Sequence, residues 1–513
     1  MRGRKSGFIL RRVRQAVQVV ALLVYVYLLF AALQQRAAFP LADLFFRLNP
    51  LAAVSSMVAA RAWIPRVALA LVTLALTLVF GRVWCGWLCP LGTVLEYVRF
   101  PAAEDRANRI PSRWRSVKYV LLILVLTGAI FGSLTLMVFD PITVFTRTMT
   151  TVVLPAFNYI VTAIERVLYP VSFFRPIIDW VERVLRGPVL PVIQPVFTMN
   201  ALIGLLFVGI LALNALADRF WCRYLCPLGG LLGLISKVSF LRPVVKASCS
   251  RCGHCVRECR LDAIETVEGY DVIPSECTVC LDCVVACPEG GVAFQWTLSA
   301  EPARDYDPSR REILTGLAAS AAGVALMRTG ARAKQPDPHL IRPPGVDDEG
   351  EFLSRCIRCS QCMKVCPTSG LQPVAFEAGI EGVWSPRLVP RLGHCDYSCN
   401  ACGQVCPSGA IPPLELEVKR QRVMGVAVVD RDRCLPWADG TPCIVCEEMC
   451  PVPDKAIVFE EEAGFGGGRG RGGGTGEGQD LQRPVVLPDL CIGCGICEYQ
   501  CPVEGESAIR VYR

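Results

Sequence analysis

The stretch that decides the fold reads CSRCGHCVREC from Cys249 to Cys259 and CTVCLDCVVACP from Cys277 to Pro288. Each half spaces its four cysteines as C-x2-C-x2-C-x3-C. Three closely spaced thiolates can bind three corners of one iron–sulfur cube, and the fourth cysteine lies far enough along the chain to reach the neighbouring cube. The tandem therefore predicts a ferredoxin module with two [4Fe–4S] clusters.

The crossed use of the fourth cysteine predicts two ligand sets. They are Cys249, Cys252, Cys255 and Cys287 for one cluster, and Cys277, Cys280, Cys283 and Cys259 for the other. Structural zinc is the alternative, because it also takes four sulfur ligands. Zinc sites usually come as two separated C-x2-C pairs, so the triplets followed by a fourth cysteine favour iron–sulfur.

Four further cysteine groups follow toward the carboxy terminus, and in each the last cysteine precedes a proline. They are Cys356, Cys359, Cys362 and Cys366; Cys395, Cys399, Cys402 and Cys406; Cys434, Cys443, Cys446 and Cys450; and Cys491, Cys494, Cys497 and Cys501. The first and last keep the 2-2-3 spacing, and the middle two widen the first gap. Together the six groups predict six [4Fe–4S] clusters held by 24 cysteines.

Composition places part of the chain in a membrane. Of 513 residues, 52% are hydrophobic and only 19% are charged. The net charge of +7 lies largely beside apolar spans, which indicates membrane topology rather than nucleic-acid binding. No histidine precedes His254 and no C-x-x-C-H occurs, so a bis-histidine haem in the membrane part and a covalent c-type haem are excluded. No flavin fingerprint is evident, so terminal chemistry is expected to belong to a partner.

Four apolar spans are expected at 15–33, 64–83, 117–139 and 199–217. Each approaches the roughly 20 residues that cross a bilayer. The amino terminus is basic and should stay in the cytoplasm, so four crossings return residue 218 to the same side. The segments 34–63 and 140–198 are expected to lie along the outer membrane surface.

The second and fourth spans end in a repeated motif. Residues 81–92 read GRVWCGWLCPLG and residues 218–229 read DRFWCRYLCPLG. A pseudo-twofold arrangement of the two halves would bring Cys85 and Cys89 toward Cys222 and Cys226 at the cytoplasmic face, each pair sharing one helix face. The four thiols could hold a seventh cluster or act as redox dithiols. Simple packing as small apolar residues is the third interpretation, which the duplication disfavours.

The joint between the two cysteine-rich regions carries an export-like signal. Arg310 and Arg311 precede a weakly apolar run, and Ala331 and Ala333 form an A-x-A pattern beyond it. This combination is typical of twin-arginine export, and a packed soluble helix is the alternative. The glycine-rich insertion at 464–478 is expected to be flexible and lacks the Lys–Ser/Thr of a phosphate-binding loop.

These features predict an α-helical membrane domain with four spans and a two-fold internal repeat, joined to α+β ferredoxin-like iron–sulfur domains. The expected boundaries are 1–245 for the membrane domain, 246–298 for the two-cluster domain, 299–340 for the linker and 341–513 for the four-cluster domain.

Two families resemble the two parts of the chain. The first 298 residues, with two C-x3-C-P motifs and a two-cluster tail, resemble the NapH-type membrane subunit of periplasmic nitrate reductase systems. From Ser309 the chain resembles the NapG-type polyferredoxin, through SRREIL, IRPPG at Ile341, and FLSRCIRCSQCMKVCP. The family's two proteins are separate, whereas here they are fused and the export-like segment is internal.

The resemblance implies a quinol-oxidising relay in the cell inner membrane, a multi-pass quinol-dehydrogenase component with no terminal catalytic site. A cytoplasmic donor is the alternative source of its electrons. Its implied partners are the bilayer, quinol, and a periplasmic reductase or cytochrome as acceptor, without nucleic acid. Residues 246–298 would be cytoplasmic and 341–513 periplasmic. The resemblance also implies that the first polyferredoxin group pairs with the fourth: Cys356, Cys359 and Cys362 with Cys501; Cys491, Cys494 and Cys497 with Cys366; Cys395, Cys399 and Cys402 with Cys450; and Cys434, Cys443 and Cys446 with Cys406.

Two other functions compete with the relay. A redox-sensing or maturation factor for a partner reductase would also need clusters beside a membrane. A ferredoxin docked to a transporter is weaker, because the apolar spans lack the acidic residues that mark transport pathways.

Overall fold

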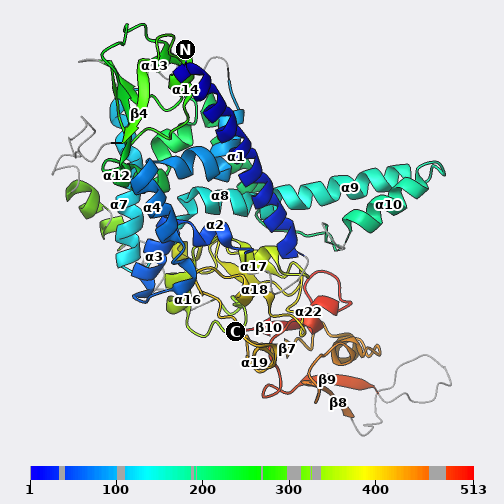
Figure 1. The fold of residues 1–513 in the computed structure, drawn as a ribbon. Coiled ribbons are helices and arrows are strands. Elements are labelled where there is room, and N and C mark those ends of the chain that lie inside the picture. The colour runs from blue at the N-terminus through cyan, green and yellow to red at the C-terminus, as the bar shows by residue number, and fades with distance from the viewer. Residues whose placement is uncertain are drawn as a thin grey trace.

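The computed structural model describes residues 2–33, 41–100, 110–186, 190–191, 193–266, 270–296, 314–319, 321–323, 325, 337–461 and 481–513. Helices make up the central body of the molecule, and small ferredoxin-like units with short helices and two-stranded sheets lie at its two ends (Figure 1). The α-helical and α+β parts are therefore separate regions of the described chain.

The helical body is organised around α1 (Arg2–Leu33), which runs along its whole length (Figure 1). Its other main helices are α3 (Pro50–Ala60), α4 (Ala70–Phe80), α5 (Pro90–Tyr97), α7 (Ser116–Ile130), α8 (Pro141–Thr148), α9 (Leu154–Leu168), α10 (Arg175–Leu185), α11 (Asn200–Ala212) and α12 (Pro227–Ser236). Helices α9 and α10 project sideways from the body (Figure 1).

The internal repeat is visible in matched helix starts. Asn49 caps α3 by accepting hydrogen bonds from the amides of Leu51 and Ala52, and a proline follows the cap. Asp140 caps α8 in the same way, again followed by proline. An oxygen cap followed by proline satisfies free amides and fixes the first helical turn. The two caps also meet, because Asn49 Nδ2 donates to Asp140 Oδ1 at 2.8 Å.

The apolar helices are shorter than the sequence indicates. Among the described residues, two helices are long and apolar enough to cross a membrane, Gly7–Ala32 and Pro141–Leu168. The other three expected spans correspond to the shorter apolar helices Pro65–Phe80, Ser116–Ile130 and Asn200–Ala215. Glycines at positive φ explain two of the early ends: Gly81 at +76° follows α4, and Gly132 at +78° follows α7. The four-span domain therefore stays a prediction, and Pro141–Leu168 lies in a segment expected along the membrane surface.

The two-cluster domain occupies one end. Strand β1 (Leu241–Val245) pairs antiparallel with β4 (Val292–Trp296), and β2 (Ile264–Glu265) with β3 (Asp271–Val272). Its helices are α13 (His254–Glu258) and α14 (Asp282–Ala286).

The four-cluster domain occupies the opposite end (Figure 1). Its antiparallel pairs are β5 (Leu371–Pro373) with β6 (Pro386–Leu388), β7 (Val426–Val429) with β10 (Ile509–Tyr512), and β8 (Ile457–Glu461) with β9 (Gln482–Val486). Its helices are α16 (Glu349–Arg355), α17 (Gln361–Lys364), α18 (Ala401–Gln404), α19 (Leu416–Arg420), α20 (Leu435–Ala438), α21 (Val445–Glu448) and α22 (Ile496–Gln500).

Two sequence predictions fall outside the described residues. They are the twin-arginine pair with its A-x-A pattern, and the glycine-rich insertion at 464–478. The insertion is flanked by Glu461 and Gln482, which face each other at the open end of the β8–β9 pair.

One continuous hydrophobic core connects the two ends. It includes Leu261 of the two-cluster domain, many residues of the helical body, and Ile357 and Cys359 of the four-cluster domain. At one end of α1, Arg11 pairs with Asp282 at 2.8 Å. Farther along the same helix, Tyr25 shares the buried core with Cys359. The ferredoxin regions are thus packed on opposite ends of a single body.

Candidate metal centres

The predicted crossing of fourth cysteines occurs in the two-cluster domain. Cys259 lines one pocket together with Cys277, Cys280 and Cys283. Cys255 lies within electrostatic reach of Cys249 and Cys287. The β2–β3 pair lies between Cys259 and Cys277 in the chain, so this hairpin brings the end of one group back to the start of the next.

The cysteine loops share an unusual backbone conformation that suits an anionic cluster. In the four groups with 2-2-3 spacing, the residues just before and just after the second cysteine both have positive φ. They are Arg251 and Gly253, Val279 and Leu281, Arg358 and Ser360, and Gly493 and Gly495. Left-handed residues that alternate with right-handed ones turn successive N–H groups toward one point, a concavity that binds anions such as iron–sulfur clusters.

Backbone amides also reach the sulfurs directly. Ala263 N donates to Cys259 Sγ at 3.2 Å, and Gly291 N to Cys287 Sγ at 3.1 Å. Hydrogen bonds of this kind stabilise thiolates and help set the potential of a cluster. Burial acts in the other direction and raises the pKa of Cys277 to about 12. Thiolate ligation at such a buried position therefore needs the positive charge of iron.

The four-cluster domain corrects the pairing that the resemblance implied. Cys366 lines a pocket with Cys395, Cys399 and Cys402, and Cys501 lines another with Cys434, Cys443 and Cys446. Cys406 interacts electrostatically with Cys356, Cys359 and Cys362, and Cys450 with Cys494. The first-with-fourth pairing is thus wrong, and adjacent groups pair instead.

The physical reason for adjacent pairing is the hairpin between each pair of groups. The β5–β6 pair separates Cys366 from Cys395, and the β8–β9 pair separates Cys450 from Cys491. Each hairpin brings the last cysteine of one group back to the start of the next group, as β2–β3 does in the two-cluster domain. The chain therefore repeats one unit, two cysteine groups joined by a hairpin, three times.

The cysteine sets also approach one another in a defined order. Cys283 interacts with Cys255 within the two-cluster domain. In the four-cluster domain, Cys362 interacts with Cys402, Cys395 with Cys494, and Cys497 with Cys446. These contacts order the four sets along the domain: the 356-set first, then the 395-set, the 491-set and the 434-set, each named by its first cysteine.

The four remaining cysteines gather inside the helical body. Cys85, Cys89, Cys222 and Cys226 are all buried in the same core. Cys89 interacts electrostatically with Cys85 and Cys222, and Cys226 with all three others. We call these four residues the cysteine quartet.

The two turns that carry the quartet are π-helical, Trp84–Leu88 and Trp221–Leu225, whereas the sequence predicted α-helical spacing. Cys89 N donates to Trp84 O at 3.0 Å and Cys226 N to Trp221 O at 2.9 Å, the i→i−5 bonds of a π-turn. Such turns are rare and are found frequently at functional sites.

Two buried arginines flank the quartet, and our sequence analysis missed them. Arg82 and Arg219 each stand three residues before the first cysteine of their motif, and each reaches into the other half of the repeat. Arg219 Nη2 donates to Cys85 O at 2.8 Å. A Cβ built at Gly229 would lie 2.8 Å from Arg82 Nη2 and 3.4 Å from Cys226 Sγ, so this arginine lies close to that sulfur. An arginine at the same position in GRVWC and DRFWC was the sequence signal that could have identified Arg82 and Arg219 as part of the site.

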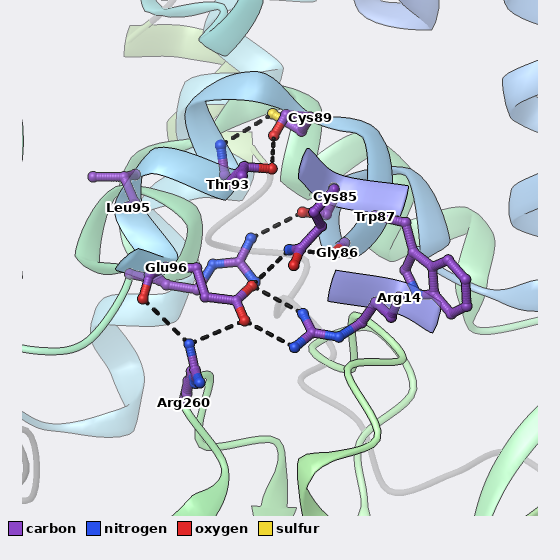
Figure 2. Close-up of polar contacts among 12 residues, drawn as sticks. Arg14, Cys85, Gly86, Trp87, Cys89, Thr93, Leu95, Glu96 and Arg260 are labelled. Atoms are coloured by element: carbon purple, nitrogen blue, oxygen red, sulfur yellow. Dashed lines mark hydrogen bonds and ion pairs between the residues drawn. The ribbon is translucent and has the colours of Figure 1, made fainter. Parts of the chain in front are cut away.

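An ion-pair network ties the quartet to the two-cluster domain. Figure 2 shows Arg14 and Arg260 reaching the carboxylate of Glu96, at 2.9 Å and 3.1 Å. Burial alone raises the pKa of Glu96, but the ion pairs with Arg14, Arg219 and Arg260 lower it to about 2. Arg260 also pairs at 3.3 Å with Asp282, the neighbour of Cys283.

On the other side of the quartet, an aromatic chain leads to the four-cluster domain. The rings of Trp84 and Phe45 are 6.4 Å apart, and those of Phe45 and Tyr25 are 5.2 Å apart. Tyr25 in turn interacts electrostatically with Cys359. The quartet therefore lies between the two ferredoxin regions.

The quartet fits a negatively charged metal cluster by the chemistry of its surroundings. Two buried guanidinium groups can balance the charge of four thiolates. In the part of the chain that the structure describes, Trp84 Nε1, Trp221 Nε1 and Arg82 Nη2 are buried without a hydrogen-bond partner, so three donors remain for an acceptor. No three His, Cys, Asp or Glu side chains among the described residues gather tightly enough for a single metal ion.

Family models match three regions of the chain. A 4Fe-4S binding domain matches residues 63–105 and 199–246, the two halves of the repeat that carry the quartet. A 4Fe-4S dicluster domain matches 355–411, the first adjacent pair in the four-cluster domain. A further 4Fe-4S binding domain matches 484–505.

Curated relatives resemble about two fifths of the chain. The methylamine utilization ferredoxin-type protein MauM of Methylorubrum extorquens is 36% identical over 216 residues, which cover 41% of this chain and 91% of the relative. The ferredoxin-type protein NapG of Escherichia coli K12 is 37% identical over 197 residues, 38% of this chain and 79% of the relative. The putative electron transport protein YccM of Escherichia coli K12 is 25% identical over 229 residues, 42% of this chain and 51% of the relative. No solved structure matches the chain.

Proposed function

The chain belongs to the family of ferredoxin-type proteins that includes MauM and NapG, and from that premise we propose that it relays electrons across a membrane between its two iron–sulfur regions. As a member with several 4Fe-4S domains, it is an iron–sulfur electron-transfer protein. In the proposed relay, quinol supplies electrons at the two-cluster domain and a periplasmic reductase or cytochrome receives them from the four-cluster domain.

One observation carries the proposal: the two ferredoxin regions pack on opposite ends of one helical body (Figure 1), and the cysteine quartet is buried in the core that connects them. The positions along α1 give the scale. Arg14 contacts Glu96 beside the two-cluster domain, and Tyr25 lies beside Cys359. Arg14 and Tyr25 are eleven positions apart on α1, which is about 16 Å at the rise of an α-helix. The basic amino-terminal end of α1 supports a cytoplasmic position for the two-cluster domain in this proposal.

The cofactors of this relay are six [4Fe–4S] clusters and one cluster at the quartet. The six would be held by the 24 cysteines in the adjacent pairings described above, and they supply one-electron transfer. The seventh would be held by Cys85, Cys89, Cys222 and Cys226. We favour a cluster over redox dithiols there, because two permanent buried charges at Arg82 and Arg219 balance a permanently anionic site.

In this relay, electrons pass through the four-cluster domain along one path and leave it at one cluster. Electrons enter at the 356-set, whose Cys359 shares the buried core with Tyr25, and pass through the 395-set and 491-set to the 434-set. The 434-set lies farthest from the helical body in this order, so it is the expected docking point for the acceptor.

The test uses full-length protein purified without oxygen and placed in lipid nanodiscs. Iron and sulfide analysis counts the clusters, and freeze-quench EPR follows their reduction by duroquinol. The wild type should reduce both ferredoxin regions. The Cys85→Ser/Cys222→Ser variant should reduce only the two-cluster domain, while dithionite still reduces all six remaining clusters. A fully loaded wild type that duroquinol fails to reduce would contradict the relay and favour the sensing or maturation function.

A further inference from the structure

The largest apolar cavity that bears on the relay lies between the helical body and the two-cluster domain. Its volume is about 650 Å³, within the range of roughly 300–1,000 Å³ that is typical of small-ligand sites. Helices α1 and α4 form one wall, through Leu10, Val17 and Leu76. The two-cluster domain forms the other, through residues such as Val279 and Phe294.

This cavity borders the cysteines of the nearest predicted cluster. Val279, Leu281 and Val284 line it, and they are the chain neighbours of Cys280 and Cys283. Trp87 lines it from the quartet's π-turn and donates from Nε1 to Val279 O at 3.0 Å. A molecule in the cavity would therefore contact both the loop of the two-cluster domain and the turn of the quartet.

The polarity of the lining restricts the ligand. Nearly all lining side chains are aliphatic or aromatic, and Lys246 is the charged residue among them. Lys246 is exposed, so the polar end of the cavity faces water. On α1, exposed Ile9 is the chain neighbour of the lining residue Leu10, so the helix surface beside the cavity is apolar as well. The cavity thus joins an apolar helix surface to a single polar group near the cluster loops.

We infer that this cavity is the quinol-binding site, with the quinol ring against Trp87 and Val279 and a ring oxygen near Lys246. The inference rests on the proposed relay and adds the place where electrons enter it. A flat, lipid-soluble molecule with two oxygens matches an apolar slot that has one polar end. Lys246 can donate a hydrogen bond to a ring oxygen, because a lysine ammonium is a donor only.

The redox step balances within the two-cluster domain. One quinol becomes one quinone with the loss of two electrons and two protons. The cysteines of the two-cluster domain would hold two [4Fe–4S] clusters, and each would supply a one-electron acceptor, so that the pair would take up both electrons of one quinol. The two protons pass to water at the Lys246 end. The electrons then move toward the quartet as the relay draws them onward.

The test measures binding directly, without turnover. Full-length protein in nanodiscs is photolabelled with an azidoquinone and digested, and the labelled peptides are identified by mass spectrometry. Label is expected on peptides that contain Trp87, Val279 or Leu10. Titration with decylubiquinone then gives the affinity of each variant. Leu76→Trp fills the cavity and should weaken binding at least tenfold, and Lys246→Met should weaken it severalfold. Leu71→Trp, on the exposed face of the same helix, is the matched control and should bind as the wild type does.

The outcomes separate this inference from the relay itself. If duroquinol reduces the wild type and Leu76→Trp equally, and the label lies elsewhere, the cavity is not the quinol site although the relay holds. If mass spectrometry finds phospholipid in the cavity that decylubiquinone does not displace, the cavity is a lipid site and the inference is overturned. If duroquinol fails to reduce the wild type, the relay has failed first. Dithionite reduction of every variant shows that the clusters are intact.

Discussion

The two-cluster domain and the first pair of groups in the four-cluster domain are built alike and docked differently. Both have a hairpin between their two cysteine groups, and left-handed residues flank the second cysteine in both groups of the two-cluster domain and in the first group of the other pair. The two-cluster domain meets the helical body through ion pairs, Asp282 with Arg11 and Arg260 with Glu96. The four-cluster domain meets it through a buried core that contains Ile357 and Cys359, and through Arg147 stacked on Trp384.

The same type of iron–sulfur module can therefore be packed on a helical body either through ion pairs or through apolar and aromatic contacts. Breaking a buried charge pair leaves an uncompensated charge, so the charged interface tolerates little change. Altering the apolar and aromatic interface removes packing and one cation–π contact, which costs less. The expected effects on the two ends therefore differ in size.

The largest expected effect tests whether each cysteine triplet takes its fourth ligand from the adjacent group, as both ferredoxin regions do in the structure. Cys359→Ser and Cys406→Ser should each lose one cluster, and the double variant should lose no more than one, because both residues belong to the same set. Iron and sulfide content per protein, measured after anaerobic purification, checks this. The control double variant, Cys359→Ser/Cys501→Ser, should lose two clusters. The reverse pattern would restore the first-with-fourth pairing.

The second effect tests the charged interface. Glu96→Gln leaves Arg14, Arg219 and Arg260 without their carboxylate, so it should destabilise the protein by about 3–5 kcal/mol. Thermal unfolding in detergent, followed by circular dichroism, gives the change. Glu351→Gln removes an exposed partner of Arg355 and should cost less than about 1 kcal/mol. Equal losses in the two variants would show that the Glu96 network does not hold this interface.

The third effect tests the aromatic interface. Arg147 lies 3.9 Å from the centre of the Trp384 ring, so Trp384→Leu should weaken docking by about 1–2 kcal/mol. Hydrogen exchange at residues 383–385 should speed up accordingly. Trp437→Leu removes the ring between Arg431 and Arg483, within the four-cluster domain itself, and should leave exchange at 383–385 unchanged. Unchanged exchange in Trp384→Leu would remove this contact from the interface.

The smallest effect is the response to pH. The folded-state pKa of Glu96 is lowered to about 2, below its usual 4.5. Its ion pairs therefore contribute their full stability above pH 4.5, and this contribution is lost as the pH falls toward 2. Between pH 8 and 5 the unfolding temperature difference between wild type and Glu96→Gln should stay constant. A difference that shrinks across that range would place the pKa of Glu96 much higher.

Cysteine spacing was enough to predict a family of 4Fe-4S domains, because a 2-2-3 run leaves few ways to surround a cube. It also predicted the crossed use of Cys259 and Cys287, which depends on local chain return. The pairing in the four-cluster domain was predicted wrongly, since it followed a resemblance rather than the short hairpins between groups. The repeated motif predicted the gathering of the quartet, which depends on the twofold relation between the halves.

Other features depend on three-dimensional neighbours that a sequence pattern does not contain. Arg82 and Arg219 stand at the ends of apolar spans, where hydropathy treats them as boundary charges, yet each reaches the opposite half of the repeat. The π-helical turns arise where Gly81 and Arg219 adopt positive φ just before the motifs. The lengths of the apolar helices were overestimated, because hydropathy does not register a left-handed glycine that ends a helix. The proposed quinol cavity forms only where the helical body packs against the two-cluster domain, and the sequence does not contain that packing.

The most direct test of the central claim is the side of the membrane on which the chain ends. Alkaline phosphatase, which is active only outside the cytoplasm, is fused after Arg513 of the full-length protein. The account predicts activity in the wild type and none when Arg310 and Arg311 are both changed to lysine. An inactive wild-type fusion, with the protein shown to be intact, would place both ferredoxin regions on one side and contradict the transmembrane relay.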